Sequence, residues 1–250
     1  MNQQKRMYLL IGGLVFAIVF FFLAIINKDS SSVDLNKGFQ CGDNLVYGDY
    51  NYKTVKIGNQ CWMAENLKTT AYRDGTNILN IPDRGEWSAD KKGGYSCYHN
   101  DIKNCENHGA LYNWYAVTNP SGLCPKGWSV PSHEKWSILE QSICNKLGHS
   151  NCEETFSISQ SAMGWTGDDE GINLRTTSLN GKDAYGFAAL FSGFRNSNGP
   201  FSFIQENGFW WTSTSTNEYA IGRAMDLKNT GIRRIESMKN SGFSVRCVMD

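Results

Sequence analysis

Four oxygen-bearing side chains lie close together in the segment TGDDEGIN, at Asp168, Asp169, Glu170 and Asn173. Carboxylate and amide oxygens are the ligands that calcium prefers, and calcium takes about six to eight of them. The spacing does not match an EF-hand loop, so these side chains would supply only part of a coordination shell. The functional interpretation of this segment is a calcium site. The alternative is an acidic loop exposed to solvent.

Aromatic side chains alternate with polar ones in a second candidate site, between residues 195 and 219. A sugar ring stacks its C–H faces on aromatic rings, and its hydroxyl groups pair with amides, carboxylates and guanidinium groups. Neighbours in a strand face opposite sides, so we expect one of Trp210 and Trp211 in the core and the other exposed or covered by a loop. The predicted carbohydrate-binding residues are Arg195, Asn196, Trp210, Trp211 and Tyr219, with Phe201 and Phe203 in the same region.

The sequence has no pattern typical of catalysis. It lacks a G-x-S-x-G elbow, a phosphate-binding G-x-x-x-x-G-K-[ST] loop and an H-E-x-x-H metal motif. A reactive thiol would require a cysteine outside a disulfide bond, and an even number of cysteines leaves none by default. We therefore expect no catalytic residues, no enzymatic activity and no cofactor other than the calcium considered above.

All eight cysteines lie beyond residue 40, and no two of them form a C-x-x-C pair. This usage is typical of disulfide bonds formed in an oxidising compartment rather than of zinc or thioredoxin-like sites. Cysteine positions alone do not determine the connectivity. Proximity in the sequence favours Cys97–Cys105 and Cys144–Cys152 across short loops and Cys41–Cys61 across a hairpin, which leaves Cys124–Cys247.

The composition is that of an ordered chain without an excess of basic residues. Lysine plus arginine and aspartate plus glutamate both number 24 in 250 residues, so the formal net charge is zero. A nucleic-acid binder needs a basic surface, and we therefore expect no nucleic-acid partner. The aromatic content of 13% is too high for a disordered chain. The length fits one or two domains.

An uncharged apolar segment, residues 8–26, precedes all of these features. As a helix, its 19 residues would span roughly 28 Å, close to the ~30 Å of a bilayer core. The segment lacks a signal-peptide cleavage site, so we expect a single transmembrane anchor. The basic residues before it place the N-terminus, residues 1–7, in the cytoplasm. Residues 27–40 are expected as a polar tether and residues 41–250 as one disulfide-bonded domain, periplasmic or extracellular.

The hydrophobic patterns of the expected domain predict a mixture of helices and strands. Alternation on both sides of a Gly-Asn turn predicts a hairpin over residues 52–63. Helical spacing predicts a short helix over residues 107–117, and a longer one over residues 132–147 that begins after Ser132 as N-cap and stops at Gly148. Two helices followed by an antiparallel meander indicate an α+β fold. The predicted strands cover residues 209–215, 220–227, 232–238 and 243–249.

Six sequence blocks follow one another along the chain: VKIGNQCWMAENL (55–67), GALYNWYAV (109–117), GLCPKGWSVPSHEKWSILE (122–140), GFAALFSGFRN (186–196), FWWTSTS (209–215) and GFSVRCV (242–248). Together they resemble the Fibrobacter succinogenes major paralogous domain family. Their order and spacing extend the resemblance over residues 41–250, and it implies a bacterial, exported or surface-attached protein with no established biochemical activity. The last block, and Cys124 before a Gly-Trp pair and a helix, are also similar to the C-type-lectin-like fold, which formylglycine-generating enzymes share.

Together these features predict a membrane-anchored, C-type-lectin-like domain outside the cytoplasm whose role is non-catalytic recognition. The expected partners are the membrane, through the N-terminal helix, and a carbohydrate such as a polysaccharide, or another envelope component such as a protein. A polar and aromatic surface built from loops would bind the ligand. Two alternatives stay open: an enzyme of the formylglycine-generating type, which would require a metal or a reactive thiol, and a structural envelope subunit.

Overall fold

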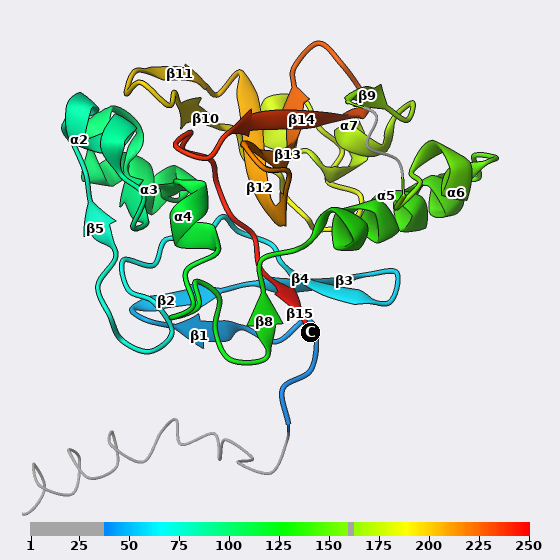
Figure 1. Cartoon of the computed structure of the whole chain (residues 1–250). Helices are drawn as coiled ribbons and strands as arrows, with labels where there is room; N and C mark the ends of the chain where they lie inside the picture. The colour runs from blue at the N-terminus through cyan, green and yellow to red at the C-terminus, as the bar shows by residue number, and fades with distance from the viewer. Residues whose placement is uncertain (1–37, 160–162) are drawn as a thin grey trace, which may run out of the picture. The chain divides into compact units, whose positions relative to one another are not determined.

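The computed structural model describes residues 38–159 and 163–250 (Figure 1). Residues Gln40–Asp250 form one compact unit. The anchor predicted for residues 8–26 lies outside the described residues. Within the described part of the chain, no helix combines the length and the apolarity that a membrane crossing needs.

Strands dominate the compact unit, and most of them pair antiparallel. The largest sheet has the order β11-β10-β12-β13-β14-β9, in which only the β10–β12 pair is parallel. The consecutive strands β12, β13 and β14 form the predicted meander. The strands are β9 (Gly164–Thr166), β10 (Ser192–Arg195), β11 (Phe201–Ile204), β12 (Asn207–Ser215), β13 (Tyr219–Asp226) and β14 (Ile232–Met238).

A second sheet joins the two ends of the compact unit and lies below the first in Figure 1. Its strand order is β3-β4-β15-β8, so the hairpin of β3 and β4 pairs with the C-terminal strand. Gly58 turns the hairpin in a left-handed conformation, which confirms the hairpin prediction. The strands are β3 (Thr54–Ile57), β4 (Gln60–Met63), β8 (Trp128–Ser129) and β15 (Val248–Met249).

Shorter elements surround these two sheets. A two-stranded sheet pairs β1 with β2, and a three-stranded sheet has the order β5-β6-β7. These strands are β1 (Leu45–Tyr47), β2 (Tyr50–Tyr52), β5 (Leu79–Asn80), β6 (Gly94–Ser96) and β7 (Leu111–Tyr112). The shorter helices are α2 (Arg84–Ala89), η1 (Tyr98–Asn100), α3 (Ile102–His108), α4 (Trp114–Val117), α6 (Cys152–Thr155), α7 (Glu170–Leu174) and η2 (Thr177–Leu179).

The longest described helix, α5 (His133–Leu147), agrees with its prediction at both ends. The Ser132 side chain accepts a hydrogen bond from the Lys135 backbone N–H, and Gly148 ends the helix in a left-handed conformation. Its apolar stripe, which includes Trp136, is buried against β12 of the six-stranded sheet. The local signals were sufficient here because capping and periodicity agree.

Two predicted elements were wrong. Residues 107–117 are not one helix, because Gly109, at φ +87°, ends α3 and the chain then enters β7. The Asn113 side chain then caps the separate helix α4. Residues 243–249 are not a fourth strand of the meander. Only β15 is a regular strand, and it joins the second sheet, where the Cys247 carbonyl accepts from Met63 N–H.

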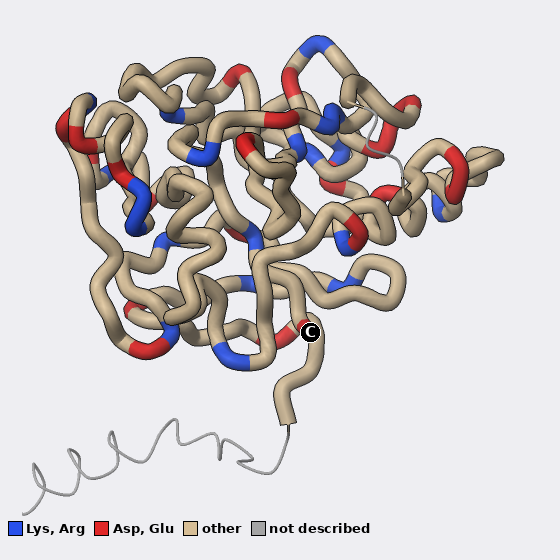
Figure 2. Tube along the Cα trace, in the orientation of Figure 1, with Lys and Arg blue, Asp and Glu red and all other residues tan. Residues whose placement is uncertain are grey.

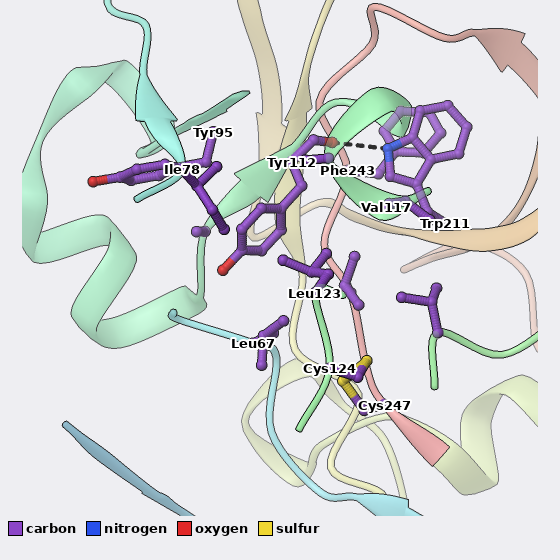
Figure 3. Packing of buried hydrophobic residues seen from close by; sticks show 14 of the residues in the cluster. Leu67, Ile78, Tyr95, Tyr112, Val117, Leu123, Cys124, Trp211, Phe243 and Cys247 are labelled. Carbon is purple, nitrogen blue, oxygen red and sulfur yellow. Dashed lines mark hydrogen bonds between the residues drawn. A yellow bond between two sulfur atoms is a disulfide. The ribbon is translucent and has the colours of Figure 1, made fainter. Parts of the chain in front are cut away.

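The structure pairs the eight cysteines as expected and confirms an α+β fold that consists mostly of strands. The Cys124–Cys247 bond links the segment before α5 to the C-terminal segment. It lies at the edge of a core cluster in which Tyr112, Trp211 and Phe243 pack together (Figure 3). A second core cluster lies on the other face of β12.

Candidate functional site

The two faces of the six-stranded sheet are covered differently. On one face, Trp210, Arg223 and Arg234 are buried beneath α5. On the other face, a row of directly paired residues crosses four strands, from Phe209 through Ala224 and Arg233 to Trp165. Directly opposite residues share a face of a sheet. Arg233 and Trp165 are exposed, so this end of the face is open to solvent.

The open end of this face contains a groove of about 510 Å³. Phe203, Phe209 and Leu227 form its apolar part, and Glu206, Asp226 and Arg233 line it with charged groups. We call it the Phe203 groove. Its residues come from β11, the turn into β12, and the facing ends of β13 and β14. Lys228 also lines it, so two acidic and two basic side chains leave the groove neutral overall.

Phe203 has an unusual backbone conformation, with φ at +66°. A bulky residue rarely occupies this region, and doing so costs on the order of 1–3 kcal/mol. Ser202 pairs directly with Phe194, so regular alternation would turn Phe203 to the opposite face. Instead, its ring stacks on Phe194 at 6.0 Å and remains 49% exposed. The strained backbone thus presents an aromatic ring at the wall of the groove.

The Phe203 ring is the outer end of a continuous series of aromatic contacts. Phe194 contacts Phe209 at 5.0 Å between ring centroids, and Phe209 stacks on Phe243 at 5.2 Å. Phe243 stacks on the buried Trp211 at 4.1 Å. Because each ring packs on the next, the exposed end is fixed by the core rather than by a loop alone.

The charged groups of the groove differ in how they are held. The Asp226 carboxylate accepts hydrogen bonds from Lys228 N–H at 2.9 Å and from Asn229 N–H at 2.7 Å, which fixes its orientation. No ion pair within residues 38–159 and 163–250 involves Glu206, Lys228 or Arg233. These side chains are therefore available to a ligand. An aromatic wall with donors and acceptors on both sides can stack a sugar ring and pair its hydroxyl groups.

The two predicted tryptophans are both completely buried. They face opposite sides of β12, as expected, but a core cluster covers each side. Trp210 donates its indole N–H to Asn66 Oδ1 at 2.9 Å, and Trp211 donates to the Tyr112 carbonyl at 2.8 Å (Figure 3). Neither ring is available to a sugar, which corrects the assignment of Trp210 and Trp211 to a ligand surface.

Arg195 is also buried, and its guanidinium donates to backbone carbonyl groups. It lies over the Trp87 ring at 4.3 Å. These contacts tie β10 to the segment before α2, so Arg195 holds loops together instead of meeting solvent. Asn196 is exposed beside it. Tyr219 is 40% exposed, at the end of β13 away from the Phe203 groove. The five predicted ligand residues therefore do not form one site.

The predicted calcium residues are only partly brought together. Asp169 lies 2.7 Å from His149 Nε2 and 3.9 Å from Lys182 Nζ. The buried Glu170 carboxylate accepts from Asp168 N–H, and Asn173 donates its amide to the Asp169 carbonyl. Within the described residues, the side chains that could share a cation here are His149, Asp169 and Glu170.

Two pKa shifts characterise this loop. The hydrogen bond to Asp169 raises the pKa of His149, and burial raises the pKa of Glu170. Lys182 and a protonated His149 would both compete with a metal cation for Asp169. Calcium binding at this loop stays a prediction.

Most residues of the Phe203 groove were not predicted from the sequence. Phe203 was included in the candidate region, but Phe209, Asp226 and Arg233 were not assigned to a site. One signal was present: residues 232–238 alternate in a strand, so Arg233 and Arg234 must face opposite sides. If one face of this strand is covered, one of the two arginines must therefore lie on the opposite face.

The charges of the described residues are dispersed over the fold. Figure 2 shows acidic and basic residues intermixed along the trace. This distribution agrees with the zero net charge of the sequence. The potential that a ligand meets is consequently set by the few groups that line each pocket.

A family model described as Fibrobacter succinogenes major domain matches residues 55–249 of the chain. No curated protein and no solved structure matches the chain. The match includes every residue that lines the Phe203 groove, the hairpin of β3 and β4 from its second residue onward, and the C-terminal strand.

Proposed function

The chain belongs to the Fibrobacter succinogenes major domain family, and from this premise we propose that its compact unit is a non-catalytic recognition module that binds a neutral carbohydrate polymer in the Phe203 groove. Family membership suggests a surface-type domain. The neutral balance of Glu206, Asp226, Lys228 and Arg233 favours an uncharged ligand with many hydroxyl groups.

One observation carries the proposal: a strained backbone holds the Phe203 ring half-exposed beside charged groups that line the same groove. Strain of this kind is maintained only where the surrounding structure determines it, and it concentrates at ligand sites. Burial would be the ordinary fate of a phenylalanine in a strand. Here the Phe203 ring stacks on Phe194, which itself packs on Phe209, and these contacts orient the Phe203 ring toward the groove.

The setting that we propose for this module is the one expected from the sequence. A C-type-lectin-like arrangement is supported by the Cys124–Cys247 bond, by α5 after Trp128, and by the pairing of β4 with β15. The four disulfide bonds support an oxidising compartment. A single N-terminal membrane anchor would display the module in the periplasm or outside the cell.

The two alternatives require features of a different kind. A reaction of the formylglycine-generating type would need a metal or a reactive thiol, and all eight cysteines are paired. A structural envelope subunit would need a protein interface in place of a carbohydrate groove. The half-exposed aromatic ring among unpaired charged groups favours the recognition module over both.

Affinity electrophoresis and calorimetry with a panel of neutral polysaccharides test this function. Phe203→Asn removes the ring, while asparagine tolerates the left-handed backbone. We expect about tenfold weaker binding, the equivalent of about 1.4 kcal/mol, since one stacking contact is lost. Tyr219→Asn is the matched control, because it removes another half-exposed ring outside the groove. Equal binding by Phe203→Asn and the native protein, or no binding to any neutral polysaccharide, contradicts the proposal.

A further inference from the structure

A second pocket lies on the other side of β11 from the Phe203 groove. Its volume is about 330 Å³, at the lower end of the ~300–1,000 Å³ that small-ligand pockets occupy. Pro82, Arg84, His99, Asn100, Arg195 and Phe201 line it, and we call it the Arg84 pocket. Phe201 and Phe203 lie two residues apart on β11 but serve different pockets, because the left-handed backbone at Phe203 interrupts the alternation.

Aromatic rings form one wall of the Arg84 pocket. The exposed His99 imidazole stacks on Tyr98 with ring centroids 4.6 Å apart and planes 11° apart. Phe201 lies 5.7 Å from His99 and 5.3 Å from Tyr98. The C–H face of a sugar ring can therefore pack against His99 and Phe201 at the mouth of the pocket.

The backbone of this wall is held in place by several contacts. His99 and Asn100 both have left-handed conformations, at φ +55° and +57°. The Cys97–Cys105 bond closes the segment. The Asn100 side chain donates to the Pro82 carbonyl, which connects the wall to the opposite side of the pocket. The imidazole is thus presented by a preorganised turn.

The charges at the Arg84 pocket are positive. Arg195 forms the floor, where burial lowers its pKa to about 10, so it remains protonated at neutral pH. No carboxylate within the described residues forms an ion pair with Arg195 or Arg84.

The nearest acidic side chains in the sequence accept hydrogen bonds from the first turns of helices. Asp83 accepts from Glu86 N–H at 2.9 Å, and Asp101 accepts from Lys103 N–H at 3.0 Å. The Asp83 charge also raises the pKa of Arg195, against the larger effect of burial. Neither lines the pocket. Two guanidinium groups therefore act on the pocket without an acidic lining residue, and the buried one is poorly screened by solvent.

We propose that the Arg84 pocket binds an acidic sugar, a hexuronate residue, with its pyranose ring against His99 and Phe201 and its carboxylate toward Arg84. A guanidinium group pairs with a carboxylate through two parallel hydrogen bonds, which gives the acid its orientation. The Arg195 charge adds attraction from below, while its own donors stay with backbone carbonyls. This site does not depend on the neutral-polymer function of the Phe203 groove.

Calorimetry with oligogalacturonate and with its methyl ester tests the proposal on the full chain carrying Phe203→Asn, so that the neutral ester does not bind through the Phe203 groove. The ester keeps the sugar ring and removes the charge. We expect the ester to bind at least about tenfold more weakly, and the binding of the acid to weaken as ionic strength rises. Equal binding of acid and ester, or no binding of the acid, overturns the proposal. Acetate binding as strongly as the oligosaccharide would also overturn it, since the ring would then contribute nothing.

Two variants locate the binding. Arg84→Gln keeps the β and γ carbons, the latter of which lies close to Gly199, and removes the charge. His99→Asn removes the ring at a position where asparagine tolerates the left-handed backbone. We expect each to weaken oligogalacturonate binding by about tenfold. Arg233→Gln and Phe203→Asn, which alter only the Phe203 groove, should leave that binding unchanged. Loss of acid binding in these two, with no loss in Arg84→Gln, would refute the assignment.

Discussion

Arg233 and Arg234 are neighbours on β14, and they serve opposite purposes. Arg234 is 1% exposed and lies 3.6 Å from Glu140 Oε2 and 3.3 Å from Ser137 Oγ, beneath α5. Arg233 is exposed at the Phe203 groove and has no ion-pair partner among the described residues. The same residue type therefore belongs to the buried framework on one face of the sheet and to an exposed groove on the other.

Burial is the physical cause of the difference. Beneath α5, Glu140 accepts from Arg223 at 2.5 Å and also faces Arg234, so one carboxylate serves two buried guanidinium groups. Burial lowers the pKa of Arg234, and Glu140 opposes that shift. A buried charge that loses its partner cannot turn to water, whereas an exposed charge can. The charged side chains on the covered face are thus held by one another, while those on the open face remain accessible to a ligand.

The largest effect that we expect comes from breaking the covered face. Glu140→Gln removes the only carboxylate that pairs with Arg223 and Arg234 in the described part of the chain. Removing one partner of a buried ion pair costs about 3–5 kcal/mol, and we expect a loss of that size in the free energy of unfolding. Urea denaturation of the native protein and the variant, with disulfide bonds intact, measures it.

Glu206→Gln is the matched control on the open face, because Glu206 is exposed. It should change the free energy of unfolding by less than about 0.5 kcal/mol. Similar losses in the two variants would mean that the two faces do not differ in the way proposed.

The elements of the fold that depend on local signals could be predicted from the sequence. Ser132 and Gly148 mark the ends of α5, and the Gly58 turn marks the hairpin of β3 and β4. Short cysteine spacings also indicated the local disulfide bonds correctly, for example Cys144–Cys152. In each case the information lies within a few residues of the element that it determines.

The candidate site could not be predicted in the same way, because it depends on which faces are covered. Trp210 and Trp211 alternate as expected, but only the packing of α5 and of Phe243 shows that both are buried. Nothing in the sequence signals a left-handed phenylalanine, since the residues that favour this conformation are Gly, Asn and Asp. Gly193 lies between Ser192 and Phe194, which pair with Ile204 and Ser202 on either side of Phe203.

A second, smaller effect should come from Gly193→Ala. At φ +63°, an added Cβ would lie 2.4 Å from the Ser202 carbonyl oxygen and 2.7 Å from Ile204 N. We expect the free energy of unfolding to fall by about 1–3 kcal/mol as β11 shifts. Because that shift moves Phe203, binding of neutral polysaccharide should also fall by about tenfold. Urea denaturation and calorimetry measure the two effects.

Gly75→Ala is the control that separates the clash of a new Cβ with β11 from the strain of a left-handed alanine. Gly75 also has a left-handed backbone, at φ +88°, but an added Cβ would meet nothing within 4 Å. This control should lose stability without losing polysaccharide binding. Unchanged binding in Gly193→Ala would show that the ring position does not matter, which would weaken the case for the groove.

The smallest effect concerns a pair of intermediate exposure, His149 and Asp169, each about one third exposed. The hydrogen bond with Asp169 raises the pKa of His149 above its ordinary value of 6.5. The folded state therefore binds the proton more tightly than the unfolded state does. The resulting stabilisation is complete below the unfolded pKa and is lost as the pH rises through the folded pKa. When the pH is raised from about 6 to about 8, the urea concentration at the unfolding midpoint should decrease more in the native protein than in His149→Gln.

Calcium provides a sharper version of this test, because a cation at Asp169 and Glu170 would compete with the protonated imidazole. If the loop binds calcium, the increase in melting temperature at millimolar calcium should be larger at about pH 8 than at about pH 6, since His149 is then neutral. In His149→Gln the increase should no longer depend on pH in this range. An increase of equal size at both pH values in the native protein would place the calcium elsewhere. With no increase at either pH, Asp169 would be a partner of His149 and Lys182 only, which is the arrangement that the structure contains.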